Sequence, residues 1–355
     1  MAASASARRV AIVGATGNIG TSVVEALRGD PGVESITALS RREPPELGTG
    51  IDWERTDIRE DDLVGRFTSA DTVVHLAWLF QPTHDPVVTW RNNVLGSIRV
   101  FEAAAAAGVR SIVYASSVAA YSPGPAGRPV NESWPTHGWP NAAYSAEKAY
   151  LERYLDGFEQ RHPNIGVTRM RTAFCFKTES AEQQRRLFIG PFLPNALVRP
   201  ELLPVLPIPA GLRFQAVHSD DVGEAYRLAV RSGSGGAFNV AADPVIDTSA
   251  LADLFQARPV TVPPQLVRTA LSAAWHLHLV PASPHLFEAF IRLPVMDTSR
   301  AREELGWSAR HSSTTAVSDF VRGLRSAAGG ASPPLRSPVP GGRVRELATG
   351  VGRVP

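Results

Sequence analysis

Short apolar runs alternate with segments of helical periodicity along the first half of the chain. Val10 to Val13 is an apolar run, and residues 21–28 then repeat apolar side chains at helical spacing until Gly29. Apolar runs at 33–40, 71–77 and 111–115 predict further strands, and the alanine-rich segment 90–107 predicts a helix. Strands that alternate with helices in this way predict an α/β fold, a doubly wound parallel sheet of the Rossmann type.

A glycine-rich turn, GATGNIG, separates the first predicted strand from the first predicted helix. The first turn of a helix leaves backbone N–H groups unpaired and carries partial positive charge, so it binds anions. Gly14 suits a tight turn, Gly17 lets a pyrophosphate approach, and Gly20 lets the helix pack closely on its strand. The GxxGxxG spacing is also compatible with an ordinary turn. The flanking strand and helix favour a dinucleotide site that includes Thr16, Asn18 and Ile19.

The end of the second predicted strand reads Ser40, Arg41, Arg42 and carries no carboxylate. In a dinucleotide fold an Asp or Glu here hydrogen-bonds the ribose 2′-hydroxyl, whereas an Arg accommodates a 2′-phosphate. Two guanidinium groups match a phosphate well, so we expect NADP rather than NAD. The alternative is that both arginines are solvated loop charges, with Glu43 close behind.

A serine, a tyrosine and a lysine occupy positions that suit proton transfer. Ser117 follows the strand predicted at 111–115, and Tyr144 and Lys148 stand four residues apart in a helical pattern, so they project from one face. A nearby ammonium lowers the pKa of a phenol by favouring the phenolate. We therefore expect Lys148 to lower the pKa of Tyr144 and make it a usable acid or base, with Ser117 holding the substrate oxygen.

Taken together, these motifs resemble the extended short-chain dehydrogenases/reductases of the NAD-dependent epimerase/dehydratase family, from about Arg9 to about Trp307. The resemblance is carried, in chain order, by GATGNIG at 14–20, Asp57, HLA at 75–77, Asn93 in RNNVLGS, Ser117 in YASSVAAY, the YxxxK pair Tyr144 and Lys148, Arg171, VHSDDV at 217–222, FNVAAD at 238–243 and MDTSRAREELGW at 296–307.

The resemblance implies a role for several of these residues. Ser117, Tyr144 and Lys148 would be catalytic, Asn93 would support them, and Lys148 would also bind the nicotinamide ribose. The implied cofactor contacts further include Asp57 and Ile58 near the adenine, Leu76, Ala77 and Arg171. The implied reaction is reversible hydride transfer between the nicotinamide and a secondary alcohol or ketone; an epimerase returns the hydride to the other face of the carbon.

Departures from the family pattern concentrate where substrate selection begins. Glu147 stands where the family often has Ser or Thr, Thr172 replaces the usual proline after Arg171, and FCFKTES at 174–180 replaces a glycine-proline turn. These differences argue against a sugar-nucleotide substrate more than against the catalytic role of Ser117, Tyr144 and Lys148.

Several further residues are candidates on the substrate side. Trp78, Phe80 and Trp90 could shape an apolar pocket or simply pack in the core. The proline-rich segment 188–209 is expected to form a lid or pocket wall. For Gln183 to Arg186 the two interpretations are a phosphate grip and a solvated face. His137 and Trp139 stand in a loop ahead of Tyr144 and are candidate substrate contacts.

Composition limits the other possibilities. The 355 residues carry 44% hydrophobic side chains and a net charge of +2, so we expect a globular protein with a small-molecule substrate and no nucleic-acid partner. A single cysteine, Cys175, excludes an intrachain disulfide and favours a cytoplasmic location. No apolar stretch is long enough for a membrane span, and prolines interrupt the segment 271–295, which we expect to form substrate-region helices, with membrane-surface contact as the alternative. A homodimer is left open.

The expected organisation is a dinucleotide-binding domain at 1–174, to which 212–245 return, and a smaller, partly helical C-terminal substrate-binding region at 175–211 and 246–325. Residues 326–355 are rich in Gly, Pro, Ser and Arg, and we expect a disordered tail. Three functions are compared: an oxidoreductase acting on a rather apolar alcohol or ketone, a nucleotide-sugar epimerase or dehydratase, and a non-catalytic NAD(P)-binding redox sensor. The retained Ser117, Tyr144 and Lys148 favour an enzyme.

Overall fold

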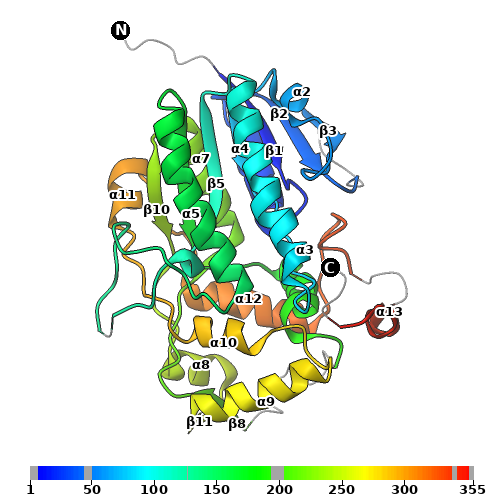
Figure 1. The fold of residues 1–355 in the computed structure, drawn as a ribbon. Helices are drawn as coiled ribbons and strands as arrows, with labels where there is room; N and C mark the ends of the chain where they lie inside the picture. Colours follow the sequence, from blue (N-terminus) through cyan, green and yellow to red (C-terminus); the bar gives the residue numbers. More distant parts are fainter. Residues whose placement is uncertain (1–6, 44–49, 126, 193–203, 338–341, 352–355) are drawn as a thin grey trace.

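A seven-stranded parallel sheet forms the centre of the computed structural model, which describes residues 7–43, 50–125, 127–192, 204–337 and 342–351 (Figure 1). The strand order is β10-β6-β5-β4-β1-β2-β3. The strands are β1 (Arg8–Val13), β2 (Val33–Ser40), β3 (Ile51–Arg55), β4 (Thr72–His75), β5 (Ser111–Ser117), β6 (Gly166–Thr172) and β10 (Gly236–Val240). This confirms the predicted α/β sheet, whose order reverses between β1 and β4, where such folds bind ligands.

Helices cover both faces of the sheet because the strands are apolar on both sides. Val10 and Ile12 of β1 face a cluster with α1 (Asn18–Arg28), α7 (Ser219–Ser232) and α11 (Ser299–Leu305). Ala11 and Val13 face the opposite cluster, with α2 (Leu63–Phe67), α4 (Gly96–Ala106) and α5 (Ala143–Arg161). Alternate side chains of one strand thus support two helical layers (Figure 1).

The glycine turn after β1 approaches its neighbours so closely that side chains would not fit. Gly14 has a φ of 90°, and a Cβ there would lie 2.6 Å from the Ala77 nitrogen. A Cβ on Gly20 would overlap the Gly14 carbonyl. Both glycines are therefore required by the packing of β1, α1 and the end of β4.

The helix predicted at 90–107 is interrupted by a wide turn. It is built from α3 (Pro86–Trp90), a π-helical turn at Arg91–Leu95 and α4. The π turn buries Asn92, Asn93 and Val94. Such turns re-aim side chains within a helix and are frequent at functional sites.

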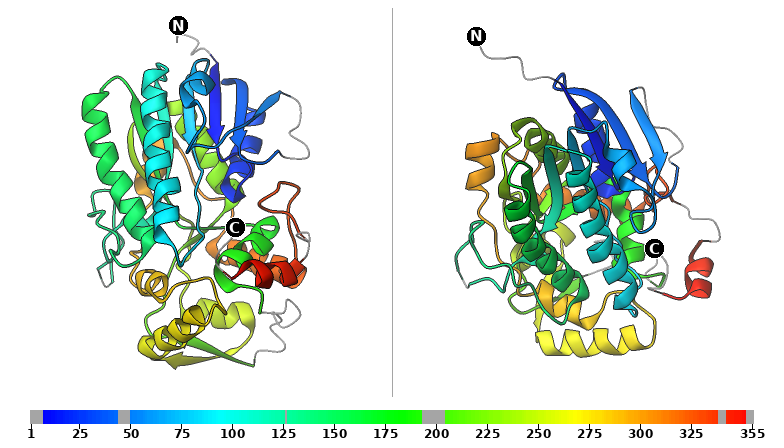
Figure 2. Two further views of the ribbon diagram at one scale, coloured as in Figure 1. Left: turned by 45° about the vertical axis from the view of Figure 1, so that its right-hand side comes forward. Right: turned by 45° about the horizontal axis from the view of Figure 1, so that its top comes forward.

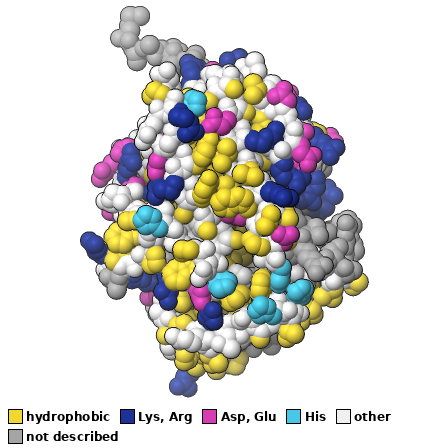
Figure 3. Space-filling view, in the orientation of Figure 1, with side chains coloured by type: hydrophobic (Ala, Val, Ile, Leu, Met, Phe, Trp, Pro, Cys, Tyr) yellow, Lys and Arg dark blue, Asp and Glu magenta, His cyan; other side chains and the backbone are white. Residues whose placement is uncertain are grey.

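A smaller, mostly helical region lies below the carboxyl ends of the sheet strands (Figure 1). Its elements are β7 (Phe174–Phe176), α6 (Ala181–Gln184), a π-helical turn at Arg185–Ile189, β8 (Val205–Pro209), β9 (Ala216–His218), α8 (Thr248–Phe255), β11 (Arg258–Val262), α9 (Pro264–His276), α10 (Pro284–Phe290) and α12 (Ser313–Arg325). β8 pairs with β11, and β7 pairs with β9. Hydrophobic side chains gather on its lower edge, over α9 (Figure 3), where Leu266 and Leu277 are exposed.

The described part of the C-terminal segment packs on the body of the protein, which differs from the expected disordered tail. Ser332 Oγ donates a hydrogen bond of 2.8 Å to the Thr16 carbonyl, and Leu335 is buried. The buried Arg185 forms an ion pair of 2.6 Å with Glu346 of α13 (Gly342–Thr349). The segment lies beside α6 and the π turn that follows it (Figure 2). Specific polar contacts, which composition does not reveal, hold it there.

Candidate active site

One cavity of about 640 Å³ extends from the glycine turn into the smaller region. It crosses the carboxyl ends of β1, β4 and β5, the expected ligand edge of such a sheet. Fifteen of the sequence-predicted site residues line it: Gly14, Thr16, Gly17, Asn18, Ile19, Gly20, Ser40, Arg41, Arg42, Ile58, Leu76, Ala77, Ser117, Tyr144 and Lys148. The fold therefore brings the predicted cofactor and catalytic positions to a single space.

Three other predicted residues do not line this cavity. Asp57 forms an ion pair of 2.8 Å with Arg59. Asn93 is fully buried, where its side chain bonds the backbone of Leu79. Arg171 is held in the interior by Glu152, with Nη2 2.9 Å from Oε2. Their side chains are committed to protein partners, so the structure gives them supporting positions rather than cavity contacts.

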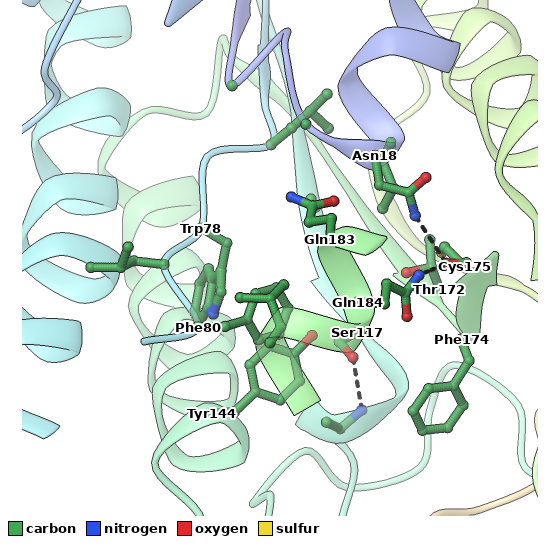
Figure 4. A pocket seen from close by; sticks show the side chains of 18 of the residues that line it. Asn18, Trp78, Phe80, Ser117, Tyr144, Thr172, Phe174, Cys175, Gln183 and Gln184 are labelled. Atoms are coloured by element: carbon green, nitrogen blue, oxygen red, sulfur yellow. Dashed lines mark hydrogen bonds between the residues drawn. The ribbon is translucent and has the colours of Figure 1, made fainter. Parts of the chain in front are cut away.

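Ser117 and Tyr144 meet in the middle of the cavity (Figure 4). Ser117 ends β5, and its Oγ accepts a hydrogen bond of 3.1 Å from the Ala119 N–H. Tyr144 lies in the first turn of α5, and its phenol oxygen points toward the Ser117 side chain (Figure 4). Burial raises the pKa of Tyr144 to about 12, although the neighbouring Ser117 hydroxyl works in the opposite direction. The phenol is therefore protonated at neutral pH.

Lys148 is fully enclosed one helical turn further along α5. Its Nζ donates a hydrogen bond of 2.5 Å to the Ala115 carbonyl and lies 3.5 Å from the ring centroid of Trp78. Burial lowers the pKa of Lys148 well below its usual value. The ammonium is 6.0 Å from the Tyr144 ring centroid. The expectation that it lowers the pKa of Tyr144 is wrong for this arrangement, because desolvation of the phenol dominates.

Aromatic side chains form the wall around Tyr144. Phe80 stacks on the Tyr144 ring with centroids 5.1 Å apart, and Trp78 meets it edge-on at 5.6 Å (Figure 4). Trp90 instead packs against Tyr150 at 4.9 Å and does not line the cavity. Sequence reasoning missed much of the remaining wall, which comes from distant segments: Phe174, Phe214, Leu271, Leu286, Phe287, Phe290, Leu293 and Phe320. No local spacing in the sequence predicts that these residues line the cavity.

Some of the remaining substrate-side candidates line the cavity, and others do not. Gln183 and Gln184 line the cavity, with Gln184 donating a hydrogen bond of 2.8 Å to the Cys175 carbonyl. Arg185 and Arg186 bind protein groups: Arg185 pairs with Glu182 and Glu346, and Arg186 donates to the Pro334 carbonyl. His137 and Trp139 are not among the lining residues. Phe188 and Ile189 line the cavity, while 193–203 of the predicted lid lie outside the described residues.

The glycine end of the cavity fits a dinucleotide. The first turn of α1 has no side-chain cap, so its N–H groups are available to an anion. A nucleotide cofactor would be held there by Gly17 to Gly20 and would reach Tyr144 along the cavity. Arg41 and Arg42 stand at the end of β2, where the adenosine ribose binds in such folds. Their guanidinium groups have no ion-pair partner among the described residues.

The described part of the chain shows neither a metal-ligand cluster nor a membrane-spanning helix. No group of three or more metal-ligating side chains occurs there. None of its helices has both the length and the apolar character needed to cross a bilayer. The fold and cavity thus define a dinucleotide-binding α/β protein.

Comparison with known proteins identifies the family. The family described as "NAD dependent epimerase/dehydratase family" matches residues 10–241, and the chain belongs to it. An uncharacterized protein of Mycobacterium tuberculosis is 26% identical over 335 residues, which cover 88% of this chain and 83% of the relative. The UDP-glucose 4-epimerase of Streptomyces lividans is 30% identical over 242 residues, which cover 62% of this chain and 70% of the relative. The predicted family is therefore confirmed.

Solved structures agree on the fold. The UDP-glucose 4-epimerase of Thermus thermophilus, solved in complex with NAD, superimposes with a TM-score of 0.67 at 23% identity, covering 90% of this chain and all of that one. That structure holds NAD, which does not support the expected preference for NADP. The substrate of the present chain has to be inferred from its own cavity.

Proposed function

We propose that this chain catalyses reversible hydride transfer between a nicotinamide dinucleotide and a secondary alcohol or ketone of apolar character. The observation that carries the proposal is the placement of the Tyr144 phenol beside the Ser117 hydroxyl in a cavity continuous with the glycine turn (Figure 4). A bound reduced nicotinamide would supply the hydride. The protein would supply the proton, the orientation and the dry surroundings.

We propose a role for each of the three residues, based on their positions in the cavity. Ser117 would hold the substrate oxygen, and the protonated Tyr144 would donate its proton to that oxygen during reduction. A phenol whose pKa is about 12 is a proton donor at neutral pH, so burial favours the reductive direction. Lys148 would orient the nicotinamide ribose next to Tyr144.

The cavity wall supports an apolar substrate. Among its described lining residues, only Arg41, Arg42 and Lys148 are charged, and the arginines stand at the adenosine end. Beyond Tyr144 the wall consists mainly of Phe, Leu, Ile and Ala side chains. A nucleotide diphosphate needs cationic or multiple N–H partners to replace its hydration. The described walls offer it no cation at the substrate end, whereas an apolar ketone would bury its surface there.

A nucleotide-sugar epimerase or dehydratase is the second candidate. It is favoured by the identity of 30% to a UDP-glucose 4-epimerase over 62% of this chain. The same Tyr144 and Ser117 would serve that reaction, since epimerisation also begins with hydride removal at an alcohol carbon. The two candidates differ in what binds beyond Tyr144, so substrate competition separates them.

The cofactor preference is proposed from charge. Arg41 and Arg42 are exposed and form no ion pair with a carboxylate of the described residues, whereas the Ser40 hydroxyl is hydrogen-bonded to Trp53 and to the Arg42 carbonyl. A 2′-phosphate would meet both guanidinium groups. We therefore propose that NADP binds more tightly than NAD, although the Thermus relative was solved with NAD.

The experiment follows nicotinamide absorbance with a panel of apolar ketones and alcohols and, separately, nucleotide sugars. We expect turnover of apolar ketones that Tyr144→Phe reduces by on the order of 100-fold or more, with cofactor binding retained. Tyr150→Phe, on an exposed part of the same helix, serves as the matched control. Turnover of nucleotide sugars alone would establish the second candidate. Cofactor binding without any turnover would indicate a redox sensor instead.

A further inference from the structure

A buried carboxylate directly precedes Lys148 on α5. Glu147 is only 2% exposed. One carboxylate oxygen accepts a hydrogen bond of 2.7 Å from Thr89 of α3, and the other accepts one of 2.8 Å from the side-chain amide of Asn93. Both donors are neutral groups. Burying a carboxylate to this extent costs free energy of folding, so we expect its contacts to serve a function that offsets this cost.

Asn93 passes the contact on to the segment that follows β4. Its Oδ1 accepts a hydrogen bond of 2.8 Å from the Leu79 N–H, and its Nδ2 donates one of 2.8 Å to the Leu79 carbonyl. The amide group thus pairs with the backbone of one residue in the manner of a neighbouring strand. The second hydrogen of Nδ2 reaches Glu147, which fixes the amide in this orientation.

The residues on either side of Leu79 touch the proposed catalytic side chains. Trp78 lies under the Lys148 ammonium, 3.5 Å from ring centroid to Nζ, and also meets Tyr144 edge-on. Phe80 stacks on the other side of the Tyr144 ring. A shift of Leu79 would therefore move both aromatic contacts together.

We propose that Glu147 is a positioning residue for the reaction: through Asn93 it sets the segment 78–80, and thereby the orientation of Tyr144 and Lys148. The inference rests on the proposed function for the meaning of that orientation. Glu147 stands where the family often has Ser or Thr. Those side chains are too short to span the distance from α5 to both Thr89 and Asn93.

A carboxylate also suits this position because of its charge. The groups that face Lys148 are Tyr144, Glu147 and Glu152 of α5, His75 of β4 and Tyr114 of β5. Burial lowers the pKa of His75 to about 3, so it is neutral. Glu152 is already paired with Arg169 and Arg171. Glu147 is therefore the carboxylate left to balance the enclosed ammonium.

Glu147→Ala separates positioning from mere packing. In the full-length protein, hydrogen–deuterium exchange of peptides spanning 76–82 reports the Leu79 amide directly and needs no substrate. We expect that amide to exchange on the order of tenfold faster, because Asn93, which accepts its hydrogen bond, is no longer held by Glu147. We also expect kcat for an apolar ketone to fall by on the order of 100-fold at an unchanged dissociation constant for the nicotinamide dinucleotide.

Two further variants keep the inference falsifiable. Glu147→Gln preserves the volume and one acceptor and should show a smaller change in exchange and kcat, which also covers the case in which the alanine variant does not fold. Glu303→Gln, an exposed carboxylate on α11, is the control and should match wild type. A folded Glu147→Ala or Glu147→Gln protein with unchanged exchange at 76–82 and unchanged kcat would overturn the positioning role. If exchange is faster in the variant but the wild-type protein turns over no substrate, the link from Glu147 through Asn93 to Leu79 stands and the proposed function is wrong.

Discussion

The ammonium of Lys148 lies 3.5 Å from the ring centroid of Trp78, and the lysine side chain is shielded from water. A desolvated cation over an indole face is stabilised by about 2 kcal/mol. Burial still lowers the pKa of Lys148 well below its usual value, although Glu147 and Glu152 favour the charged form; the contact with the ring adds to their effect.

Replacing Trp78 by Leu tests this contact through the pH dependence of turnover. The variant keeps an apolar side chain but loses the π face, so the ammonium is less favoured and the pKa of Lys148 falls further. Activity that needs the ammonium is lost as pH rises through this lower pKa, and the basic limb of the kcat/KM profile should move to lower pH. Trp90→Leu, which alters a ring outside the cavity, should leave the limb in place. An unmoved limb in Trp78→Leu would show that the ring does not stabilise the cation.

Arg42→Ala should weaken NADPH binding selectively. A charge-assisted bond to a 2′-phosphate contributes about 1.5 to 3 kcal/mol, so we expect its dissociation constant to rise by roughly 10- to 100-fold, with little change for NADH. Arg41→Ala should act in the same direction. Titration by nicotinamide fluorescence measures both cofactors, and Arg28→Ala, at the surface end of α1, controls for general charge. An equal effect on NADH and NADPH would refute the 2′-phosphate site.

The buried Glu152 predicts a specific loss of stability in acid. Burial favours its neutral form, but Arg171 and Arg169 outweigh burial and lower the pKa of Glu152 from 4.5 to about 2. A depressed pKa stabilises the fold above the unfolded value, so this contribution of about 3 kcal/mol is present at neutral pH and is lost as pH falls from 4.5 toward 2.

Urea unfolding across this range measures the effect. Glu152→Gln should lower the free energy of unfolding at pH 7, because two guanidinium groups lose their buried partner, and it should flatten the dependence between pH 4.5 and 2. A slope equal to that of wild type would assign the acid sensitivity to other carboxylates.

Ser332→Ala tests the contact between the C-terminal segment and the glycine turn. The substitution leaves the Thr16 carbonyl without the donor at 2.8 Å. The net value of such a bond is about 0.5 to 1.5 kcal/mol, so we expect the cofactor to dissociate roughly two- to tenfold faster in stopped-flow measurements. Ser326→Ala, whose hydroxyl bonds only carbonyls of its own helix, is the control. Identical dissociation rates would mean that this segment does not steady the turn.

Local features of the sequence predicted the core of the site. The spacing of Gly14, Gly17 and Gly20 predicts a strand, turn and helix, and at Gly14 and Gly20 the close approach of neighbouring backbone leaves no room for a side chain. Tyr144 and Lys148 share a helix face because of their spacing, and Ser117 reaches them because parallel strands end at a common edge. Such relationships depend on residues near one another in the chain or on the regular geometry of the sheet.

Only the tertiary structure decided the protonation and partners of these residues. Desolvation of the phenol, rather than the nearby lysine, sets the pKa of Tyr144, and Arg171 is paired with Glu152 instead of facing the cavity. Phe174, Phe214 and Phe290 come from three separate segments to one wall, and Ser332 reaches Thr16 across 316 positions of sequence. Desolvation and long-range packing arise from how distant segments meet, so no local pattern of residue types encodes them.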